Sequence, residues 1–487
     1  MGTAIVHVRS VRALLVVALA LALVVAATWI GRGPFWQGAA EPIRIGAVFP
    51  LGGNAAGLAG QQLRGLRIAA DLVNADGGIG GRPVALDVRD LESRDDAPAV
   101  MAALKAAGAS VVIGAYSSDL SMAASAAAAA EGLVYWEGGA VADRLTGRGL
   151  PLVFRVGASG ANLGAGSATF AATQLAPRLG RTAAVLRVAV VNANDEYAMS
   201  VADAVVATAA QTAMPIVSRT SYELAIPDWP RVMADLAASR PDVIILASHI
   251  PDGIAFRQAM LAAGVHAPAL IGTTMAECDP DFAGELGPDA IGVFASDRPT
   301  GGFQPSALDP DARRAYDRLA AAWATAGGSH ATGGGAVESP EASGGAGGGD
   351  YYGGYDGAGG SGYGGASGSE YAIEGPIEES TPAAGPTEEG LSGFTAGWVL
   401  FEHVLSAALR GGSLDAQGVA AAARALDLPV GSLPNGAGVR FSADPATLGQ
   451  NERAAAVIWQ WQAVRSYTFV WPATYATGSI EFVPLSR

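Results

Sequence analysis

Cysteine, lysine and histidine are scarce in this chain of 487 residues, which has one cysteine and five histidines. The single cysteine, Cys278, excludes an internal disulfide and a zinc site built from several thiolates. A chain of this length buries enough surface to fold without cross-links. We therefore expect Cys278 to be a small packed residue.

Positive charge is also in short supply. Lysine and arginine number 30 against 45 aspartates and glutamates, which gives a net charge of −15. A nucleic-acid-binding surface needs clustered arginine and lysine to neutralise phosphates, so this class of protein is not expected. We interpret the acidity as an aid to solubility.

The residue patterns of catalysis are missing as well. No G-x-S-x-G turn, H-E-x-x-H pair or phosphate-binding loop is present. Only one histidine, His249, directly follows a predicted strand, where functional groups concentrate. The glycine-rich loop at 50–60 does not match the G-x-G-x-x-G fingerprint of dinucleotide sites. We predict a protein that is not an enzyme and that uses no cofactor and no metal.

The N-terminus carries an apolar run without charge at residues 13–30, preceded by a short basic flank. Eighteen helical residues span about 27 Å, close to the thickness of the hydrocarbon core of a bilayer. A cleaved signal peptide and an uncleaved membrane anchor both fit residues 1–40. In either case the rest of the chain is expected outside the cytoplasm, in the periplasm or at the cell surface.

From residue 42 onward, short apolar runs alternate with helical spacing, which predicts repeated βαβ units. Strands are predicted at 43–49, 84–90, 111–114, 133–136, 152–156, 187–192, 215–222, 242–247, 268–272 and 291–295. Helices are predicted at 97–107, 119–131, 161–178, 195–213, 228–239 and 252–263, with a further helix around Leu63–Val73. This alternation predicts an α/β fold of two doubly wound parallel-sheet lobes.

Residues 326–390 break the alternation, because they are rich in Gly, Ser and Tyr and have no apolar period. Too little apolar surface is present to offset the entropy of ordering, so we predict a disordered insertion. A tyrosine-bearing contact loop for a partner is the alternative. Helices at 391–409 and 414–426 and a strand at 456–461 are expected after it.

Ligands of doubly wound sheets bind beyond the carboxyl ends of the strands, near helix N-termini. Tyr116 and Ser118 lie at the start of the helix after the third strand, where a serine hydroxyl and helix N–H groups form a cradle for a carboxylate or an amide. Plain helix capping is the alternative role for this serine. Glu137, at the end of the fourth strand, is expected to add a charge within the cleft.

Several motifs occur in a familiar order: Ile45-Gly-Ala-Val-Phe-Pro-Leu-Gly52, Val73-Asn-Ala-Asp-Gly-Gly-Ile-Gly-Gly-Arg-Pro83, Val153-Phe-Arg155, Arg187-Val-Ala-Val-Val191 and Val457-Ile-Trp-Gln-Trp461. With them the sequence resembles the Leu/Ile/Val-binding family of type I periplasmic binding proteins, which deliver solutes to ABC importers. The resemblance implies a clamshell whose lobes are joined by a hinge. Its expected first lobe is 41–158 plus 288–427, and its expected second lobe is 159–287 plus 428–487.

The resemblance also implies a ligand site between the lobes. Its first-lobe positions align with Ser118, Gly139 and Val141, and an aromatic of the first loop aligns with Leu58. Its second-lobe positions align with Tyr197, His249 and Thr274. Val141 stands where the family has a threonine, and Thr274 stands where it has the acid that receives an α-ammonium group, with Glu277 nearby.

These departures suggest a relative tuned away from branched-chain amino acids, toward amides, polyols, short-chain acids or another small solute. The resemblance implies that the chain captures this ligand by hinge closure and passes it to the permease of an ABC importer. The alternative is a membrane-anchored sensor that uses the same clamshell and reports to a partner protein.

Overall fold

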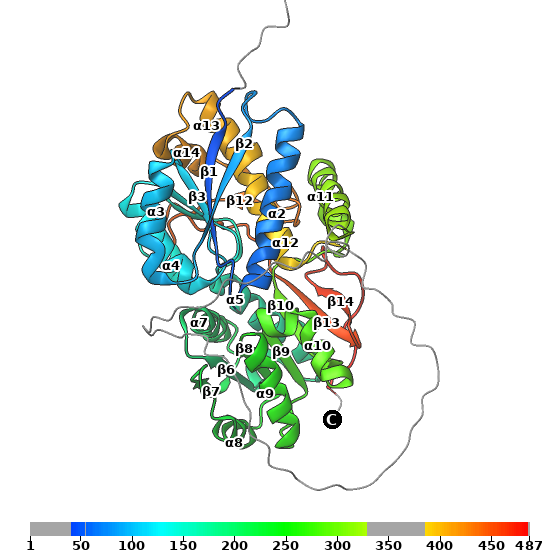
Figure 1. Ribbon diagram of the computed structural model, residues 1–487. Helices are drawn as coiled ribbons and strands as arrows, with labels where there is room; N and C mark the ends of the chain where they lie inside the picture. Colours follow the sequence, from blue (N-terminus) through cyan, green and yellow to red (C-terminus); the bar gives the residue numbers. More distant parts are fainter. Residues whose placement is uncertain (1–39, 54, 329–384, 486–487) are drawn as a thin grey trace, which may run out of the picture.

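The computed structural model describes residues 40–53, 55–328 and 385–485, and two α/β lobes account for most of them (Figure 1). The apolar run expected at 13–30 and most of the predicted insertion at 326–390 lie outside the described residues. At the two ends of that insertion the chain is helical, in α11 (Pro310–Gly328) and from Glu388 onward. The predicted disorder is therefore wrong for residues 326–328 and 388–390.

The first lobe is built on a five-stranded parallel sheet in the order β2-β1-β3-β4-β5. Its strands are β1 (Ile43–Phe49), β2 (Val84–Asp90), β3 (Val111–Gly114), β4 (Val134–Glu137) and β5 (Val153–Arg155). Ile45 and Phe49 point to the face covered by α2 (Ala56–Ala75), α12 (Glu388–Trp398), α13 (Ser406–Arg410) and α14 (Ala416–Arg424). Val48 points to the opposite face, covered by α3 (Ala97–Ala106) and α4 (Ser118–Ala130). Burial on both faces explains why the inner strands β1, β3 and β4 are mostly apolar, whereas the edge strand β2 carries three charged residues.

The second lobe has a seven-stranded sheet in the order β14-β13-β10-β9-β8-β6-β7. Its strands are β6 (Val188–Ala193), β7 (Ile216–Tyr222), β8 (Val243–Ala247), β9 (Ala269–Thr273), β10 (Phe294–Asp297), β13 (Val457–Ala463) and β14 (Ser466–Trp471). The first five are parallel, whereas β13 and β14 add an antiparallel edge. Its helices are α5 (Gly160–Phe170), continued by a π-helical turn (Ala171–Leu175) and α6 (Ala176–Arg178), and α7 (Glu196–Gln211), α8 (Trp229–Ser239), α9 (Ile250–Ala262) and α10 (Pro280–Leu286).

Two of the expected lobe boundaries need correction. The second segment of the first lobe was expected to begin at residue 288, yet β10 pairs with β9 and β13 in the second sheet. The chain therefore returns to the first lobe only after residue 297. The return to the second lobe was expected at residue 428, yet Phe441 packs edge-on against Trp136 and Phe154 of the first lobe. A two-stranded ribbon of β11 (Asp427–Leu428) and β12 (Val439–Arg440) precedes that crossing.

Glycine is required where α2 and α12 cross. A Cβ atom on Gly65 would lie 1.9 Å from the carbonyl oxygen of Gly390, and one on Gly393 would lie 2.0 Å from that of Gln62. The two backbones approach closely because neither helix carries a side chain at the contact. Helix α12, the first helix after residue 384, is held against α2 of the first lobe by this close contact.

Among the described residues, no helix combines the length and the apolar character needed to cross a membrane.

Candidate functional site

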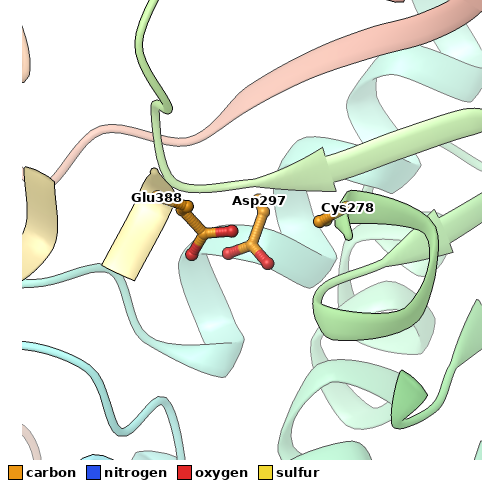
Figure 2. Close-up of side chains that lie close together, drawn as sticks. All are labelled: Cys278, Asp297 and Glu388. Atoms are coloured by element: carbon orange, nitrogen blue, oxygen red, sulfur yellow. The ribbon is translucent and has the colours of Figure 1, made fainter. Parts of the chain in front are cut away.

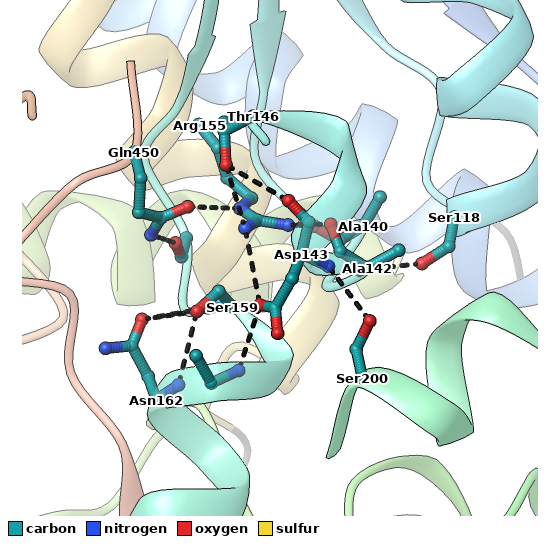
Figure 3. A network of polar contacts seen from close by, with 12 residues as sticks. Ser118, Ala140, Ala142, Asp143, Thr146, Arg155, Ser159, Asn162, Ser200 and Gln450 are labelled. Atoms are coloured by element: carbon teal, nitrogen blue, oxygen red, sulfur yellow. Dashed lines mark hydrogen bonds and ion pairs between the residues drawn. The ribbon is translucent and has the colours of Figure 1, made fainter. Parts of the chain in front are cut away.

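The carboxyl ends of both sheets meet where the lobes touch, and on the first-lobe side the contact is made by residues 138–146, which we call the β4 loop (Figure 3). Glu137, fully buried, folds back under this loop. Its Oε1 atom accepts the N–H groups of Gly138, Gly139 and Ala140 at 3.0, 2.8 and 3.0 Å. Its Oε2 atom accepts the hydroxyl of Tyr135 at 3.2 Å. The expectation that Glu137 adds a charge within the cleft is therefore wrong, because its carboxylate organises its own loop.

Burial raises the pKa of Glu137 above its usual value, although these hydrogen bonds favour the charged form and oppose the shift. A carboxylate that accepts several successive backbone N–H groups fills the kind of concavity that otherwise binds anions. The loop thus supplies its own anion.

A buried arginine, Arg155, also holds the β4 loop (Figure 3). Arg155, 1% exposed, donates from Nη1 to the carbonyl oxygen of Ala142 at 2.7 Å and from Nε to Oε1 of Gln450 at 2.5 Å. Its Nη2 atom reaches Thr146 at 3.4 Å and lies 4.0 Å from the carboxylate of Asp143. Desolvation lowers the pKa of Arg155 to about 10, which still leaves it charged at neutral pH. The guanidinium fork therefore fixes the β4 loop to the last crossing segment of the chain.

Ser118 and Ser200 complete the support of the β4 loop. The Oγ atom of Ser118 accepts the N–H of Ala142 at 3.1 Å, and that of Ser200, on α7 of the second lobe, accepts the N–H of Asp143 at 3.0 Å. Asp143 in turn accepts the N–H of Ala161, at the start of α5. The β4 loop is thus hydrogen-bonded to both lobes.

The remaining first-lobe candidates divide between the junction and the core. Val141 lies at the junction, where it belongs to one apolar cluster with Tyr197 of the second lobe and with Ala158 of the segment between β5 and α5. Tyr116, which has a φ of 76°, and Leu58 pack instead on the apolar core of the first lobe. Ser117, the residue before Ser118, is the N-cap of α4, and its hydroxyl accepts the N–H of Leu120. Helix capping is therefore the role of Ser117 and not of Ser118.

On the second-lobe side, Tyr197 and His249 lie together. Their ring centroids are 5.0 Å apart, and the Tyr197 hydroxyl donates to the carbonyl oxygen of Ser248 at 3.1 Å. His249 lies between two carboxylates, with Nε2 3.3 Å from Asp195 and Nδ1 3.7 Å from Asp252. Burial alone would lower the pKa of His249, but Asp252 and Asp195 outweigh it and the pKa is raised. The two carboxylates thus favour the protonated form of the imidazole.

Thr274 and Glu277 follow β9 in the same region. Thr274, at a φ of 69°, donates its N–H to the carbonyl oxygen of Ser296 at 2.8 Å. Its hydroxyl and both carboxylate oxygens of Glu277 are buried and have no hydrogen-bond partner among the described residues. Desolvation, reinforced by the charge of Asp252, raises the pKa of Glu277 to about 8. Thr274 supplies no charge at this position. The acid three residues later, Glu277, is fully buried.

An ion-pair network beside the crossing segments was not predicted from the sequence. Arg298 donates from Nε to Oε1 of Glu388 at 2.7 Å and from Nη1 to the carbonyl oxygen of Gly139 at 2.5 Å. Cys278, Asp297 and Glu388 place their ligand atoms within 4.8 Å of one another (Figure 2). Because Arg298 already neutralises Glu388, this arrangement favours an ion-pair network over a metal centre. The signal in the sequence was an Asp-Arg pair at the end of an apolar strand.

Comparison with known proteins identifies the architecture. The family model described as "Periplasmic binding protein" matches residues 42–339. The chain belongs to this family. Members of the family bind ligands without catalysing a reaction, and the family is extracytoplasmic. The resemblance suggested by the sequence motifs and the predicted two-lobed α/β fold are thereby confirmed.

Curated relatives and solved structures agree with this assignment. The Leu/Ile/Val-binding protein homolog 8 of Brucella abortus is 31% identical over 257 residues, which cover 52% of this chain and 64% of that relative. The substrate-binding protein of a branched-chain amino acid transporter from Streptococcus pneumoniae, solved with isoleucine, has a TM-score of 0.61 at 16% identity, covering 89% of this chain and 100% of that one. A solute-binding protein from R. palustris, solved with benzoate, has a TM-score of 0.59 at 16% identity, covering 92% and 100%. At these identities the solved structures show the shared fold alone.

Proposed function

We propose that this protein captures a small organic ligand between its two lobes by hinge closure and delivers it to an ABC importer. The observation that carries the proposal is the junction itself, where the carboxyl ends of both sheets face each other across the β4 loop. In doubly wound folds this edge is where ligands bind. The relatives support the same role, since proteins of this fold have been solved with isoleucine and with benzoate.

The hinge is proposed to lie in the segments that connect the lobes. The chain leaves β5 for α5 through residues 156–159, leaves β10 for α11 after residue 297, and re-enters the second sheet at β13. Closure is driven only by the difference in ligand affinity between the closed and open states. Residues of one lobe that contact the ligand in both states therefore change its affinity without changing closure. Bonds across the junction, such as that between the Asp143 N–H and Ser200, change the equilibrium between the open and closed states.

The ligand positions of the junction remain proposals: Ser118, Gly139 and Val141 from the first lobe, and Tyr197, His249 and Thr274 from the second. The structure modifies the sequence-based proposal at two of them. Both backbone groups of Gly139 already have partners, because its N–H is donated to Glu137 and its carbonyl accepts from Arg298. Ser118 accepts from Ala142. A ligand carboxylate would have to displace the bond from the Gly139 N–H to Glu137, whereas the Ser118 hydroxyl keeps its proton to donate.

A thermal-shift screen of the purified full-length protein tests the proposal. The compounds are amino acids, amides, urea, polyols, short organic acids and amines. A ligand that binds only the native state raises the melting temperature once its concentration exceeds its Kd. At a concentration of a hundred times Kd, it adds about 2.7 kcal/mol to the free energy of unfolding. A shift confined to one chemical class supports solute capture, whereas no shift across the whole screen would contradict it.

A further inference from the structure

The hydrogen bonds of the three crossing segments show where the chain passes from one lobe to the other. In the first crossing, Val156 donates its N–H to the carbonyl oxygen of Glu137, at the end of β4, at 2.9 Å. Gly160, four residues later, begins α5 of the second lobe. The first crossing therefore changes lobes at residues 157–159.

The other two crossings are equally abrupt. Asp297 ends β10 of the second sheet, whereas the side chain of its neighbour Arg298 is bonded to the first lobe. In the third crossing, Asn451 donates its N–H to the carbonyl oxygen of Arg155 in β5 at 3.0 Å, and β13 of the second sheet begins at Val457. Each crossing therefore changes lobes within a few residues.

One small cavity lies where the three crossings meet, and we call it the crossing cavity. Gly157 lines it from the first crossing, Arg298 from the second and Ala455 from the third. Residues of the β4 loop and of α12 complete the lining on the first-lobe side. The centre of a water molecule has about 10 Å³ of space there, which is room for about one water.

Two hydroxyl-bearing residues of α12 line this cavity, and their hydrogen bonding differs. The hydroxyl of Ser392 donates to the carbonyl oxygen of Gly138 at 2.7 Å. Thr395 is 1% exposed, and its hydroxyl has no hydrogen-bond partner in the described part of the chain. Buried polar groups nearly always bond either a protein group or an ordered water. The Thr395 hydroxyl, beside a cavity of this size, therefore indicates a bound water.

The backbone of the lining supplies acceptors for such a water. The carbonyl oxygen of Gly138 accepts the Ser392 hydroxyl, and that of Gly157 accepts Nε2 of Gln450 at 3.3 Å. A carbonyl oxygen has two lone pairs, so each of them accepts a second hydrogen bond without losing the first. A water bonded to Thr395 and to one or both of these carbonyls has the two to four polar partners that ordered internal waters need.

We propose that the crossing cavity holds one ordered water molecule, which hydrogen-bonds the Thr395 hydroxyl and a backbone carbonyl of the lining. The water thereby joins α12 to the segments that connect the lobes. An anion is disfavoured there, because Arg298, the charged residue of the lining, is already paired with Glu388 and lies 3.5 Å from the carboxylate of Asp297. This water site does not depend on which solute binds between the lobes.

High-resolution crystal structures of the full-length protein and of two variants provide the direct test. In the wild-type protein we expect an ordered water within about 3.2 Å of Thr395 Oγ1 and of a carbonyl oxygen of the lining. Thr395→Ser retains the hydroxyl and should retain the water, whereas Thr395→Val should lose it. A wild-type structure without this water, or with Thr395 Oγ1 bonded to a protein group instead, would overturn the inference.

Denaturant unfolding in solution gives a second test, in which the sign of the effect decides. If a water bonds the hydroxyl, Thr395→Val removes that bond and the unfolding midpoint falls. If the hydroxyl has no partner, the valine removes a buried unpaired polar group and the midpoint rises, which would overturn the inference. Thr325→Val is the control, because this exposed hydroxyl of α11 bonds the carbonyl oxygen of Ala321 at 2.6 Å, and its midpoint should stay nearly unchanged. Neither outcome affects solute capture, which the thermal-shift screen tests separately.

Discussion

Arg298, which directly follows the last strand of the parallel part of the second sheet, donates from Nη1 to the carbonyl oxygen of Gly139 in the first lobe at 2.5 Å. The same guanidinium is paired with Glu388 at the start of α12. One side chain thus joins the β4 loop, the crossing segment after β10 and the helix that follows the insertion. Its burial makes the pair costly to break from one side only.

Replacing this arginine should destabilise the protein strongly. Arg298→Met leaves Glu388 buried without a counter-charge, and we expect a loss of about 3–5 kcal/mol in the free energy of unfolding. The double variant with Glu388→Gln should recover part of that loss. The exposed pair of Arg313 and Asp317 is the control, where Arg313→Ala should cost about 1 kcal/mol or less. Equal losses in denaturant unfolding at both pairs would contradict the structural role of Arg298.

Removing the carboxylate under the β4 loop should also destabilise the fold. Glu137→Ala leaves the N–H groups of Gly138, Gly139 and Ala140 without their acceptor, and we expect a loss of about 3 kcal/mol. Glu137→Gln retains one acceptor oxygen and should lose less. Glu131→Gln, on the exposed end of α4, should change stability by only about 0.5 kcal/mol. If Glu137→Ala behaved like this control, the carboxylate would not organise the loop.

The serine bond across the junction should affect closure more than folding. Ser200→Ala removes the acceptor for the N–H of Asp143, and a bond worth about 1 kcal/mol predicts a roughly fivefold loss of affinity for the compound with the largest thermal shift. Ser218→Ala, whose hydroxyl bonds Ser239 within the second lobe, should leave affinity unchanged. Calorimetric titration of both variants distinguishes the two effects, and equal affinities would argue against a role for this bond in closure.

The buried acid after β9 predicts a specific dependence of stability on pH. The pKa of Glu277 is raised to about 8 in the folded protein, so the folded state binds a proton that the unfolded state releases above its ordinary pKa. The contribution of Glu277 to the free energy of unfolding is therefore largest below its ordinary pKa, and it decreases as the pH rises toward 8. Relative to Glu277→Gln, the wild-type protein should lose up to about 1.4 kcal/mol per pH unit between pH 5 and 8. Parallel pH profiles of the two proteins would contradict a raised pKa.

The sequence was sufficient for most of the strands because the inner strands of each sheet are covered on both faces, whereas α10, α11 and β14 were not predicted. Runs such as Val111–Gly114 and Val243–Ala247 are apolar throughout, which identifies them as buried strands. The lobe boundaries were harder, because an apolar run such as Phe294–Asp297 fits either sheet equally well. Only its pairing with β9 and β13 decides which sheet contains it.

The chemistry of the candidate site was harder to predict than its position in the fold. The family resemblance implied a ligand site that includes Ser118, Val141, Tyr197 and His249, and this site stays a proposal. In the structure, Val141 packs with Tyr197, and the Tyr197 ring lies against His249. The sequence analysis misread Glu137, because a carboxylate at a strand end points outward or back under its loop according to backbone angles that sequence does not specify. Arg298 and Glu388 were missed because their partners lie far apart in the chain, with the insertion between them.

Hinge closure requires that a bound ligand draw the two lobes together. Small-angle X-ray scattering of the full-length protein, with and without the compound that gives the largest thermal shift, measures this directly. We predict that the radius of gyration falls on ligand addition. The scattering profile with ligand should match the lobe arrangement of this structure, in which the β4 loop contacts α7. A ligand that binds tightly and leaves the scattering profile unchanged would contradict hinge closure.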